Sequence, residues 1–236
     1  MKILIIIPAY NEEANIVGVV EKLRREVPQY DYIVVNDGSR DHTARICREH
    51  GFELIDLPVN LGLTGAVQAG MRYAYQMGYD AAIQIDGDGQ HNPAYIPEME
   101  RIMEAERCDV VVGSRFVTQK RPKSLRMLGN VIISWAVKLT TGKTMSDPTS
   151  GMRLFSRPLI RCFANELNFG PEPDTVSYLL RCGAQMQELQ VTMNERVAGE
   201  SYLTFGRSMK YMMEMCISIF MIQGFRKKID LAEKEG

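Results

Sequence analysis

The feature that most constrains the fold is an alternation, in the first half of the chain, between short apolar runs and longer amphipathic stretches. The amphipathic stretches predict helices at about Glu12–Glu26, Asp41–His50, Thr64–Met77 and Pro93–Glu106. Strands that alternate with helices predict an α/β fold with a mostly parallel central sheet flanked by helices. The apolar runs, rich in β-branched residues, predict strands buried on both faces at Lys2–Pro8, Tyr32–Asn36, Phe52–Leu57, Ala81–Asp86 and Asp109–Ser114.

Polar or turn-forming residues follow four of these predicted strands. The carboxyl ends of parallel strands lie at one edge of a sheet, and folds of this class bind their ligands there. The segments expected at that edge are Pro8–Glu12, Asn36–Ser39, Asp86–Gln90 and Gly113–Arg115. The sequence therefore predicts one binding site built from four loops.

Asp86, Asp88 and Gln90 alternate with glycines directly after a buried apolar run. Three oxygen ligands on one tight turn suit a hard divalent cation that bridges phosphate oxygens and keeps some of its waters. The alternative is an ordinary surface turn, in which Asp and Gly are the commonest residues. The preceding strand favours a metal site, because it brings both carboxylates to the ligand edge.

Asp37 also follows a buried strand, and its carboxylate can either accept an N–H from a nucleobase or cap the next helix. We assign the capping role to Asp41 and the ligand role to Asp37. In the same way Asn11 can cap the first helix, which leaves Tyr10 and Glu12 to contact the base and the ribose.

Charge and cysteine content exclude several kinds of protein. The formal net charge of -1 gives no general attraction to nucleic acid, so no nucleic-acid partner is expected. The five cysteines show no CxxC pair, which indicates reduced thiols in a cytoplasmic protein. The apolar run Ile3–Ile7 has no cleavage site after it and is too short for a signal peptide, so it predicts a strand.

The region after Arg115 is basic, and cations there favour a substrate that bears a phosphate. A solvated basic loop is the alternative for each of these cations. We favour Arg126 as a phosphate ligand, because it lies at the start of an otherwise apolar helix predicted at Leu125–Thr140. The cations are Lys120, Arg121, Lys123 and Arg126. Further along the chain, the sequence predicts a loop at Ser146–Arg153 and a helix that begins at Pro171–Asp174.

Seven short motifs keep their order over about residues 3 to 205. They are Pro8-Ala9-Tyr10-Asn11-Glu12, Asn36-Asp37-Gly38-Ser39, Asn60-Leu61-Gly62, Asp86-x-Asp88-x-Gln90, Gly113-Ser114-Arg115, Ser150-Gly151-x-Arg153 and Arg196-x-x-Gly199-x-Ser201. As a set they resemble the family 2 glycosyltransferases. The most similar subgroup contains dolichyl-phosphate mannose synthase and the bacterial polyprenyl-phosphate hexosyltransferases.

The resemblance implies a GT-A fold for residues 1–205, a nucleotide-sugar donor, Mg²⁺ or Mn²⁺ as cofactor, and inversion at the anomeric carbon. Asp86, Asp88, Arg115 and Asp147 are the implied catalytic residues. The metal falls to Asp86, Asp88 and Gln90. The donor site implied is Pro8, Tyr10, Glu12, Asp37, Gly38, Asp86 and Arg196, and the acceptor phosphate site is Arg115, Arg126 and Arg153.

The predicted reaction transfers a hexose to a polyprenyl phosphate, from UDP-glucose or UDP-N-acetylglucosamine in preference to GDP-mannose. The first alternative is a saccharide hydroxyl as acceptor, for which a base such as Asp147 must remove a proton. The second is a nucleotide-sugar-binding module without turnover. One departure from the subgroup is Tyr202, where relatives often have a lysine that contacts phosphate.

Residues 206–236 predict an amphipathic helix followed by a basic tail. Lys210, Glu214 and Ser218 recur every four residues and predict one polar stripe on an otherwise apolar helix. The charge-free run Met215–Phe225 is shorter than the roughly 20 residues that span a bilayer. The apolar surface can cover the catalytic domain, form a homo-oligomer, or lie in a headgroup layer. The basic run Arg226-Lys227-Lys228 favours the headgroup layer. We therefore predict a peripheral location at the cytoplasmic face of the membrane. A small integral membrane protein is a predicted partner that could supply an anchor.

Overall fold

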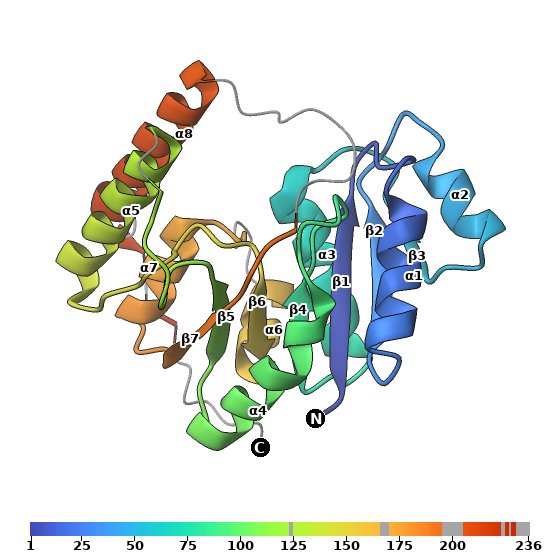
Figure 1. The fold of residues 1–236 in the computed structure, drawn as a ribbon, viewed down its shortest axis with the longest axis horizontal. Coiled ribbons are helices and arrows are strands. Elements are labelled where there is room, and N and C mark those ends of the chain that lie inside the picture. Colours follow the sequence, from blue (N-terminus) through green and yellow to red (C-terminus); the bar gives the residue numbers. More distant parts are fainter. Residues whose placement is uncertain (123–124, 166–169, 195–204, 223–224, 227, 230–236) are drawn as a thin grey trace.

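The protein is described by a computed structural model that covers residues 1–122, 125–165, 170–194, 205–222, 225–226 and 228–229. Within these residues one seven-stranded sheet has helices on both sides (Figure 1). The strand order is β3-β2-β1-β4-β6-β5-β7. The strands are β1 (Ile3–Ala9), β2 (Asp31–Asn36), β3 (Leu54–Asp56), β4 (Ala81–Gln84), β5 (Val110–Ser114), β6 (Arg153–Ser156) and β7 (Met186–Gln190).

The described helices follow the strands in the order expected for an α/β protein. Five lie in the first half of the chain: α1 (Ile16–Glu26), α2 (Thr43–Glu49), α3 (Gly62–Gln76), the short 3₁₀ helix η1 (Pro93–Tyr95) and α4 (Ile96–Glu106). The others are α5 (Leu125–Thr141), α6 (Arg157–Asn165), α7 (Pro173–Arg181), α8 (Phe205–Ile217) and the π-helical turn η2 (Ser218–Ile222).

The predicted mostly parallel sheet is confirmed. Strand β1 is an inner strand and pairs in parallel with β2 and β4, and β5 pairs in parallel with β7. The exception is β6, which runs antiparallel between β4 and β5. Since β6 starts where β4 and β5 end, the loop that enters β6 lies at the same edge as the carboxyl ends of the parallel strands.

The first strand shows why its sequence is apolar without interruption. Ile3, Ile5 and Ile7 belong to the core on one face of the sheet, while Leu4 and Ile6 belong to the core on the other face. Successive side chains of a strand point to opposite faces, so a strand covered on both sides needs apolar residues at every position.

Helices α5, α7 and α8 lie together at one end of the sheet (Figure 1). Ile219 of η2 is fully buried against Ile133, Ala136 and Val137 of α5. On α8, Tyr211 donates a hydrogen bond to Glu172. No helix among the described residues is long and apolar enough to cross a membrane.

The predicted polar stripe on the C-terminal helix is wrong for Ser218. Its side chain is buried and donates a hydrogen bond to Asp174 Oδ2 at 2.6 Å, whereas Lys210 and Glu214 are exposed and pair at 3.7 Å. The α-helix ends at Ile217 and a π-helical turn begins at Ser218, which changes the direction of the side chains that follow.

Candidate active site

The loops after β1 and β2 are joined by hydrogen bonds, as expected for neighbouring parallel strands. Asn11 donates from its backbone nitrogen to Ser39 Oγ at 2.9 Å, and Arg40 N donates to Asn11 Oδ1 at 2.9 Å. Asn11 has a positive φ of 56°, which short polar side chains tolerate. It therefore connects two loops and does not cap α1, contrary to the prediction, because α1 begins only at Ile16.

Asp41 bonds the start of α2 as predicted, although the N-cap residue is its neighbour His42. Its Oδ1 accepts hydrogen bonds from Thr43 N at 2.9 Å and Thr43 Oγ1 at 2.6 Å in the first turn of α2. Burial alone would raise the pKa of the Asp41 carboxyl, but the hydrogen bonds from Thr43 and Glu13 outweigh burial and lower it. Thr43 also accepts a hydrogen bond from Glu12 N at 2.9 Å, so this cap holds the loop after β1 as well.

Asp37 is buried and holds the loop that precedes α3. Its Oδ1 accepts a hydrogen bond from Leu61 N at 2.7 Å, while Asp37 N donates to Ala9 O at 2.9 Å. Gly38 has φ +63°, and an added Cβ there would lie 2.6 Å from the backbone of Val59 and Asn60. The Asn60-Leu61-Gly62 motif therefore packs directly on the strand-two loop, where only glycine fits.

The turn after β4 is held by a histidine that the sequence interpretation missed. Asp86 N donates to His91 Nδ1 at 3.0 Å, and His91 Nε2 lies 3.6 Å from Asp86 Oδ2. Gln84 donates to Asp86 Oδ1 at 2.8 Å, and Gln90 N donates to Asp88 Oδ1 at 3.0 Å. His91 is buried, so its ring holds the Asp86 backbone and lies beside the Asp86 carboxylate on the protein side.

Two glycines let backbone approach this turn closely. A Cβ on Gly87 would lie 3.1 Å from Pro8 O, and a Cβ on Gly151 would lie 3.2 Å from Asp86 Oδ2 and from His91 Cε1. Gly151 belongs to the loop before β6, so that loop lies beside the Asp86 carboxylate. A side chain at either glycine would push its neighbour aside by a few tenths of an ångström.

The donor atoms of this turn fit a hard divalent cation that takes most of its ligands from elsewhere. Among the described residues there is no group of three or more His, Cys, Asp and Glu side chains placed to hold a metal alone. Asp86 and Asp88 supply two carboxylates beside the glycine-lined turn. Mg²⁺ is commonly held by one or two carboxylates together with substrate phosphates and water, so two carboxylates meet its requirement when a diphosphate is bound.

Arg115 and Asp147 form a two-point ion pair at the other side of the loop before β6. Arg115 Nε donates to Asp147 Oδ2 at 2.6 Å and Arg115 Nη2 donates to Asp147 Oδ1 at 2.9 Å. Asn130 of α5 and Thr149 donate to the same Oδ1, at 2.8 and 3.0 Å. Arg115 keeps 31% of its side chain exposed, while the Asp147 side chain has no exposure.

These contacts keep Asp147 ionised. Burial by itself would raise the pKa of its carboxyl, but the hydrogen bonds and positive charge of Arg115 more than offset this and lower the pKa below its ordinary value. A carboxylate that is buried, paired with a guanidinium and accepting several hydrogen bonds is a weak proton acceptor. Asp147 therefore acts on Arg115 by fixing its position.

Strand β7 supplies two further residues that the sequence interpretation missed. Glu188 accepts hydrogen bonds from the backbone nitrogens of Ser146, at 2.8 Å, and Asp147, at 3.0 Å. Gln190 donates to Arg115 O at 2.9 Å. One edge strand thus holds the backbone on both sides of the ion pair. The only sequence signal was Glu188 and Gln190 at alternating positions of a short polar segment.

Three arginines predicted to face phosphates have different outcomes. Arg153 contradicts the prediction, because it is 1% exposed and donates to Pro148 O at 2.7 Å and Pro171 O at 2.6 Å. Burial also lowers the pKa of its guanidinium. Arg126 begins the first turn of α5, but its side chain lies outside what the structure describes, and Arg196 lies outside the described residues.

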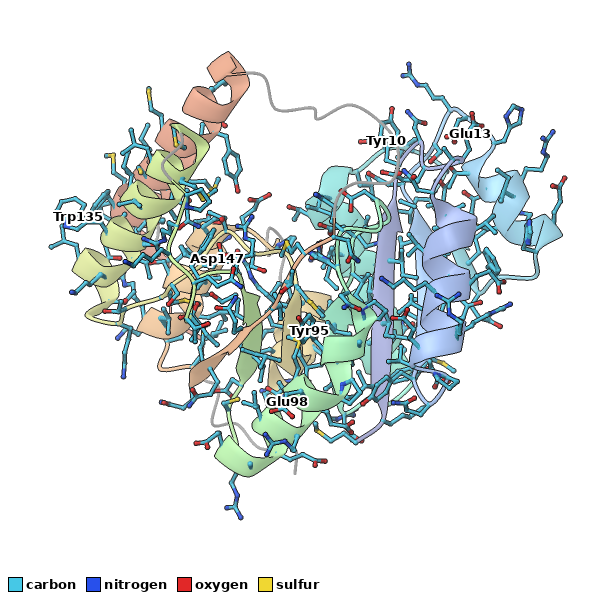
Figure 2. The ribbon with its side chains drawn as sticks, in the orientation of Figure 1. Tyr10, Glu13, Tyr95, Glu98, Trp135 and Asp147 are labelled. Carbon is cyan, nitrogen blue, oxygen red and sulfur yellow. The ribbon has the colours of Figure 1, made fainter. Side chains whose placement is uncertain are left out.

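Three residues predicted to contact the nucleoside, Pro8, Tyr10 and Glu12, lie at or just after the end of β1. Pro8 is buried within the strand and Tyr10 is half-buried just beyond it. Figure 2 labels Tyr10 near this end of the sheet. Glu12 accepts a hydrogen bond from Asn15 Nδ2 at 2.7 Å. The chain after β7 returns to the turn that follows β4, where Asn194 N donates a hydrogen bond to Gln90 O at 2.8 Å. Arg196 follows two positions later in the sequence.

Comparison with known proteins gives a consistent result. Residues 4–163 match the family model described as glycosyl transferase family 2. The undecaprenyl-phosphate mannosyltransferase of Micrococcus luteus is 32% identical over 224 residues, which are 87% of this chain and 89% of the relative. A UDP-N-acetylglucosamine–dolichyl-phosphate N-acetylglucosaminyltransferase of Methanococcus voltae is 33% identical over 186 residues, covering 70% and 73%.

Solved structures show the same fold. Glucosyl-3-phosphoglycerate synthase from Mycobacterium tuberculosis, in complex with phosphoglyceric acid, aligns with a TM-score of 0.69 over 96% of this chain and 81% of that chain. The sequence identity is 20%, so this likeness concerns the fold alone.

Proposed function

The chain belongs to glycosyl transferase family 2, and from that membership we propose that it transfers a hexose from a nucleotide-diphosphate sugar to a polyprenyl phosphate, with inversion at the anomeric carbon. Both curated relatives described above are named for transfer to a lipid phosphate. UDP-glucose and UDP-N-acetylglucosamine are the donors to test first, followed by GDP-mannose.

The observation that supports a phosphate acceptor is the state of Asp147. A saccharide hydroxyl needs a base to remove its proton. Asp147, the acid predicted to serve as that base, is fully buried and bonded to Arg115, Asn130 and Thr149. A phosphate monoester is already ionised at neutral pH, so its oxygen can attack without a base.

In the proposed reaction an anionic phosphate oxygen attacks C1 of the hexose and the bond between C1 and the β-phosphate oxygen breaks. The nucleoside diphosphate leaves with the bonding electron pair. Arg115, fixed at two points by Asp147 but still partly exposed, offers positive charge to a phosphate at this edge. The pairing with Asp147 fixes the guanidinium before substrate binds.

We propose Asp86, Asp88 and Gln90 as the residues that hold Mg²⁺ or Mn²⁺ together with the diphosphate. When bound, the cation supplies positive charge to the leaving group. Asp37 and Gly38 form the wall on which the nucleoside rests, beside Tyr10 and Pro8.

A matrix of nucleotide sugars against short-chain polyprenyl phosphate, with and without EDTA, tests the proposal. We expect transfer from one nucleotide sugar, loss of product with EDTA, and recovery on adding Mg²⁺ or Mn²⁺. Transfer to a saccharide hydroxyl with no transfer to the lipid phosphate would identify the alternative acceptor class. Binding of a nucleotide sugar without product from any acceptor would identify a binding module.

A further inference from the structure

Helix α5 carries exposed large apolar side chains on the side that faces away from the sheet. Trp135 and Leu139 are 61% and 62% exposed. Figure 2 shows Trp135 projecting outward from α5, away from Asp147. The spacing of three and four residues places all five such side chains on one side of the helix. They form what we call the outer face of α5: Leu128, Val131, Ile132, Trp135 and Leu139.

The inner face of the same helix is already used. Ile133, Ala136 and Val137 are buried against Ile219, and Asn130 donates a hydrogen bond to Asp147. A helix of an isolated domain usually has one apolar face and one polar face. Because the core is already served by the inner face of α5, the apolar character of the outer face has no role within the described structure. A contiguous exposed apolar surface marks an interaction site.

The neighbouring helix α8 also carries exposed apolar side chains. It packs against α5 so closely that a Cβ on Gly129 would collide with Met212. The two helices lie side by side in Figure 1. The exposed apolar side chains of α8 and η2 are Met213, Ile217, Phe220 and Met221.

The charge around α5 identifies the chemistry of the partner. Residues 110 to 146 contain no Asp or Glu, although the whole chain has a net charge of -1. Lys120, Lys138 and Lys143 are exposed. Glu214 is an exposed acid of the adjoining helix α8, and it is paired with Lys210 at 3.7 Å. Exposed apolar side chains on a segment with cations and no acids suit an anionic lipid surface, where the apolar groups enter the headgroup boundary and the cations meet lipid phosphates. The seven cations of this segment are Arg115, Lys120, Arg121, Lys123, Arg126, Lys138 and Lys143.

We propose that the outer face of α5 docks on an anionic lipid bilayer, with Trp135 at the level of the headgroups. This assigns the main membrane contact to α5, whereas the sequence had placed it on residues 206–236. This docking surface is not part of the proposed sugar transfer and adds a membrane contact to it. Asn130, on the opposite side of α5, donates a hydrogen bond to Asp147, the partner of Arg115, so the same helix carries the proposed docking surface and a contact to the candidate site.

Trp135 is the single tryptophan of the chain, so its fluorescence reports directly on the proposed contact. The probes are vesicles of phosphatidylcholine mixed with phosphatidylglycerol, and vesicles of phosphatidylcholine alone. We expect the anionic vesicles to shift the Trp135 emission to shorter wavelength and to reduce its quenching by iodide. Flotation of the protein with an unchanged emission spectrum would overturn the proposal, because another surface would then be in contact.

The double variant Trp135→Glu/Leu139→Glu tests the surface by flotation. Both residues are exposed, so the fold should persist, which circular dichroism checks. We expect the affinity for anionic vesicles to fall at least about tenfold. The matched control is Met77→Glu, which adds charge at another exposed apolar residue, 52% exposed at the end of α3, and should float like the wild type.

Two other outcomes would overturn the proposal. One is a double variant that floats as well as the wild type. The other is a dimer in lipid-free solution, seen by analytical ultracentrifugation, that the double variant dissociates, because the outer face would then be the contact between two copies of this chain.

A separate measurement distinguishes failure of this inference from failure of the proposed function. The double variant should transfer sugar to a water-soluble short-chain polyprenyl phosphate at the wild-type rate, and lose transfer to a long-chain acceptor in anionic vesicles. Equal loss with both acceptors would contradict a docking role. If the wild type uses neither acceptor, the proposed acceptor is wrong, whereas the flotation and fluorescence results still decide the docking surface.

Discussion

Asp147 and Arg115 make an ion pair whose two partners are unequally buried. Replacing Arg115 by Ala leaves a carboxylate without its counter-charge in a site with no exposure, whereas replacing Asp147 by Asn leaves a guanidinium that still reaches solvent. We therefore expect Arg115→Ala to lower the free energy of unfolding by about 3–5 kcal/mol. Asp147→Asn should lower it by about 1.5–3 kcal/mol, the value of hydrogen bonds to a charged group. Urea unfolding at pH 7 measures both, and a larger cost for Asp147→Asn would contradict this description of the pair.

The same pair predicts a pH dependence. The pKa of Asp147 is lowered in the folded protein, mainly because Arg115 outweighs the effect of burial. A lowered carboxyl pKa stabilises the fold above the unfolded-state pKa, and this stability is lost as the pH falls through the folded-state pKa. The difference in free energy of unfolding between wild type and Asp147→Asn should be constant above about pH 5 and shrink below about pH 4. A difference that grows on acidification would show that the folded-state pKa is raised.

Asp88 is predicted to be required for transfer and dispensable for folding. In Asp88→Asn the side-chain oxygen can still accept the hydrogen bond from Gln90 N, so the turn is kept, while a charged metal ligand is lost. We expect the rate to fall on the order of 10²–10³. The matched control is Asp80→Asn, since Asp80 also accepts a backbone hydrogen bond, from Lys2, and should leave the rate unchanged. More than a tenth of wild-type transfer in Asp88→Asn, at saturating Mg²⁺ or Mn²⁺, would disprove the metal assignment.

At the scale of elements, the loop before β6 connects the two halves of the site. Its Asp147 end holds Arg115, and its Gly151 end lies beside Asp86, with no room for a side chain unless a neighbour moves. Gly151→Ala places a methyl group about 3.2 Å from Asp86 Oδ2, so the carboxylate must move. We expect transfer to fall about tenfold, equivalent to about 1.4 kcal/mol in the barrier.

Gly18→Ala is the matched substitution, because nothing lies within 4 Å of its added Cβ on α1. It should raise the free energy of unfolding by about 0.5–1 kcal/mol and leave the rate unchanged. Wild-type transfer by Gly151→Ala would show that the Asp86 position is not set by this loop.

The elements that the sequence predicted are those with a strong and uninterrupted pattern. All five predicted strands exist. Four of them are buried over most of their length, as expected for parallel strands covered on both faces. The predicted burial is wrong for β3, whose three residues are half-buried or exposed because it is the edge strand of the sheet. Strand β6 was missed because it has four residues and starts with Arg153, and β7 was missed because its polar residues serve a loop. His91, Asn130 and Glu188 were missed for a related reason, since each acts on a partner in another element or through a backbone contact.

At the scale of the whole molecule, the sequence predicted the GT-A fold and the edge of the sheet at which the loops meet. It did not predict which side chains of α8 and η2 would pack against α5 and α7 and which would stay exposed. An amphipathic pattern shows that a helix has an apolar face, but it does not say what covers that face. The burial of Arg153 is similar, because an arginine at this position can face a phosphate or three carbonyls. The placement of Pro148, Pro171 and Glu172 decides between them, and the sequence does not give it.

The last prediction concerns the way residues 206–222 support the molecule. Ile219 is fully buried between α5 and α7, while its neighbour Phe220 is 44% exposed. Ile219→Ala should lower the free energy of unfolding by about 2–5 kcal/mol through the cavity it leaves. Phe220→Ala should change it by no more than about 0.5 kcal/mol, as for most surface substitutions. Urea unfolding compares the two.

Truncation after Phe205 removes Ile219 together with Tyr211 and Ser218, so it should destabilise α5 and with it Asn130, the partner of Asp147. If truncation abolishes lipid binding, the cause would be damage to the outer face of α5. Equal stability of the Ile219→Ala and Phe220→Ala proteins would contradict the supporting role of α8, because α5 would then not need it.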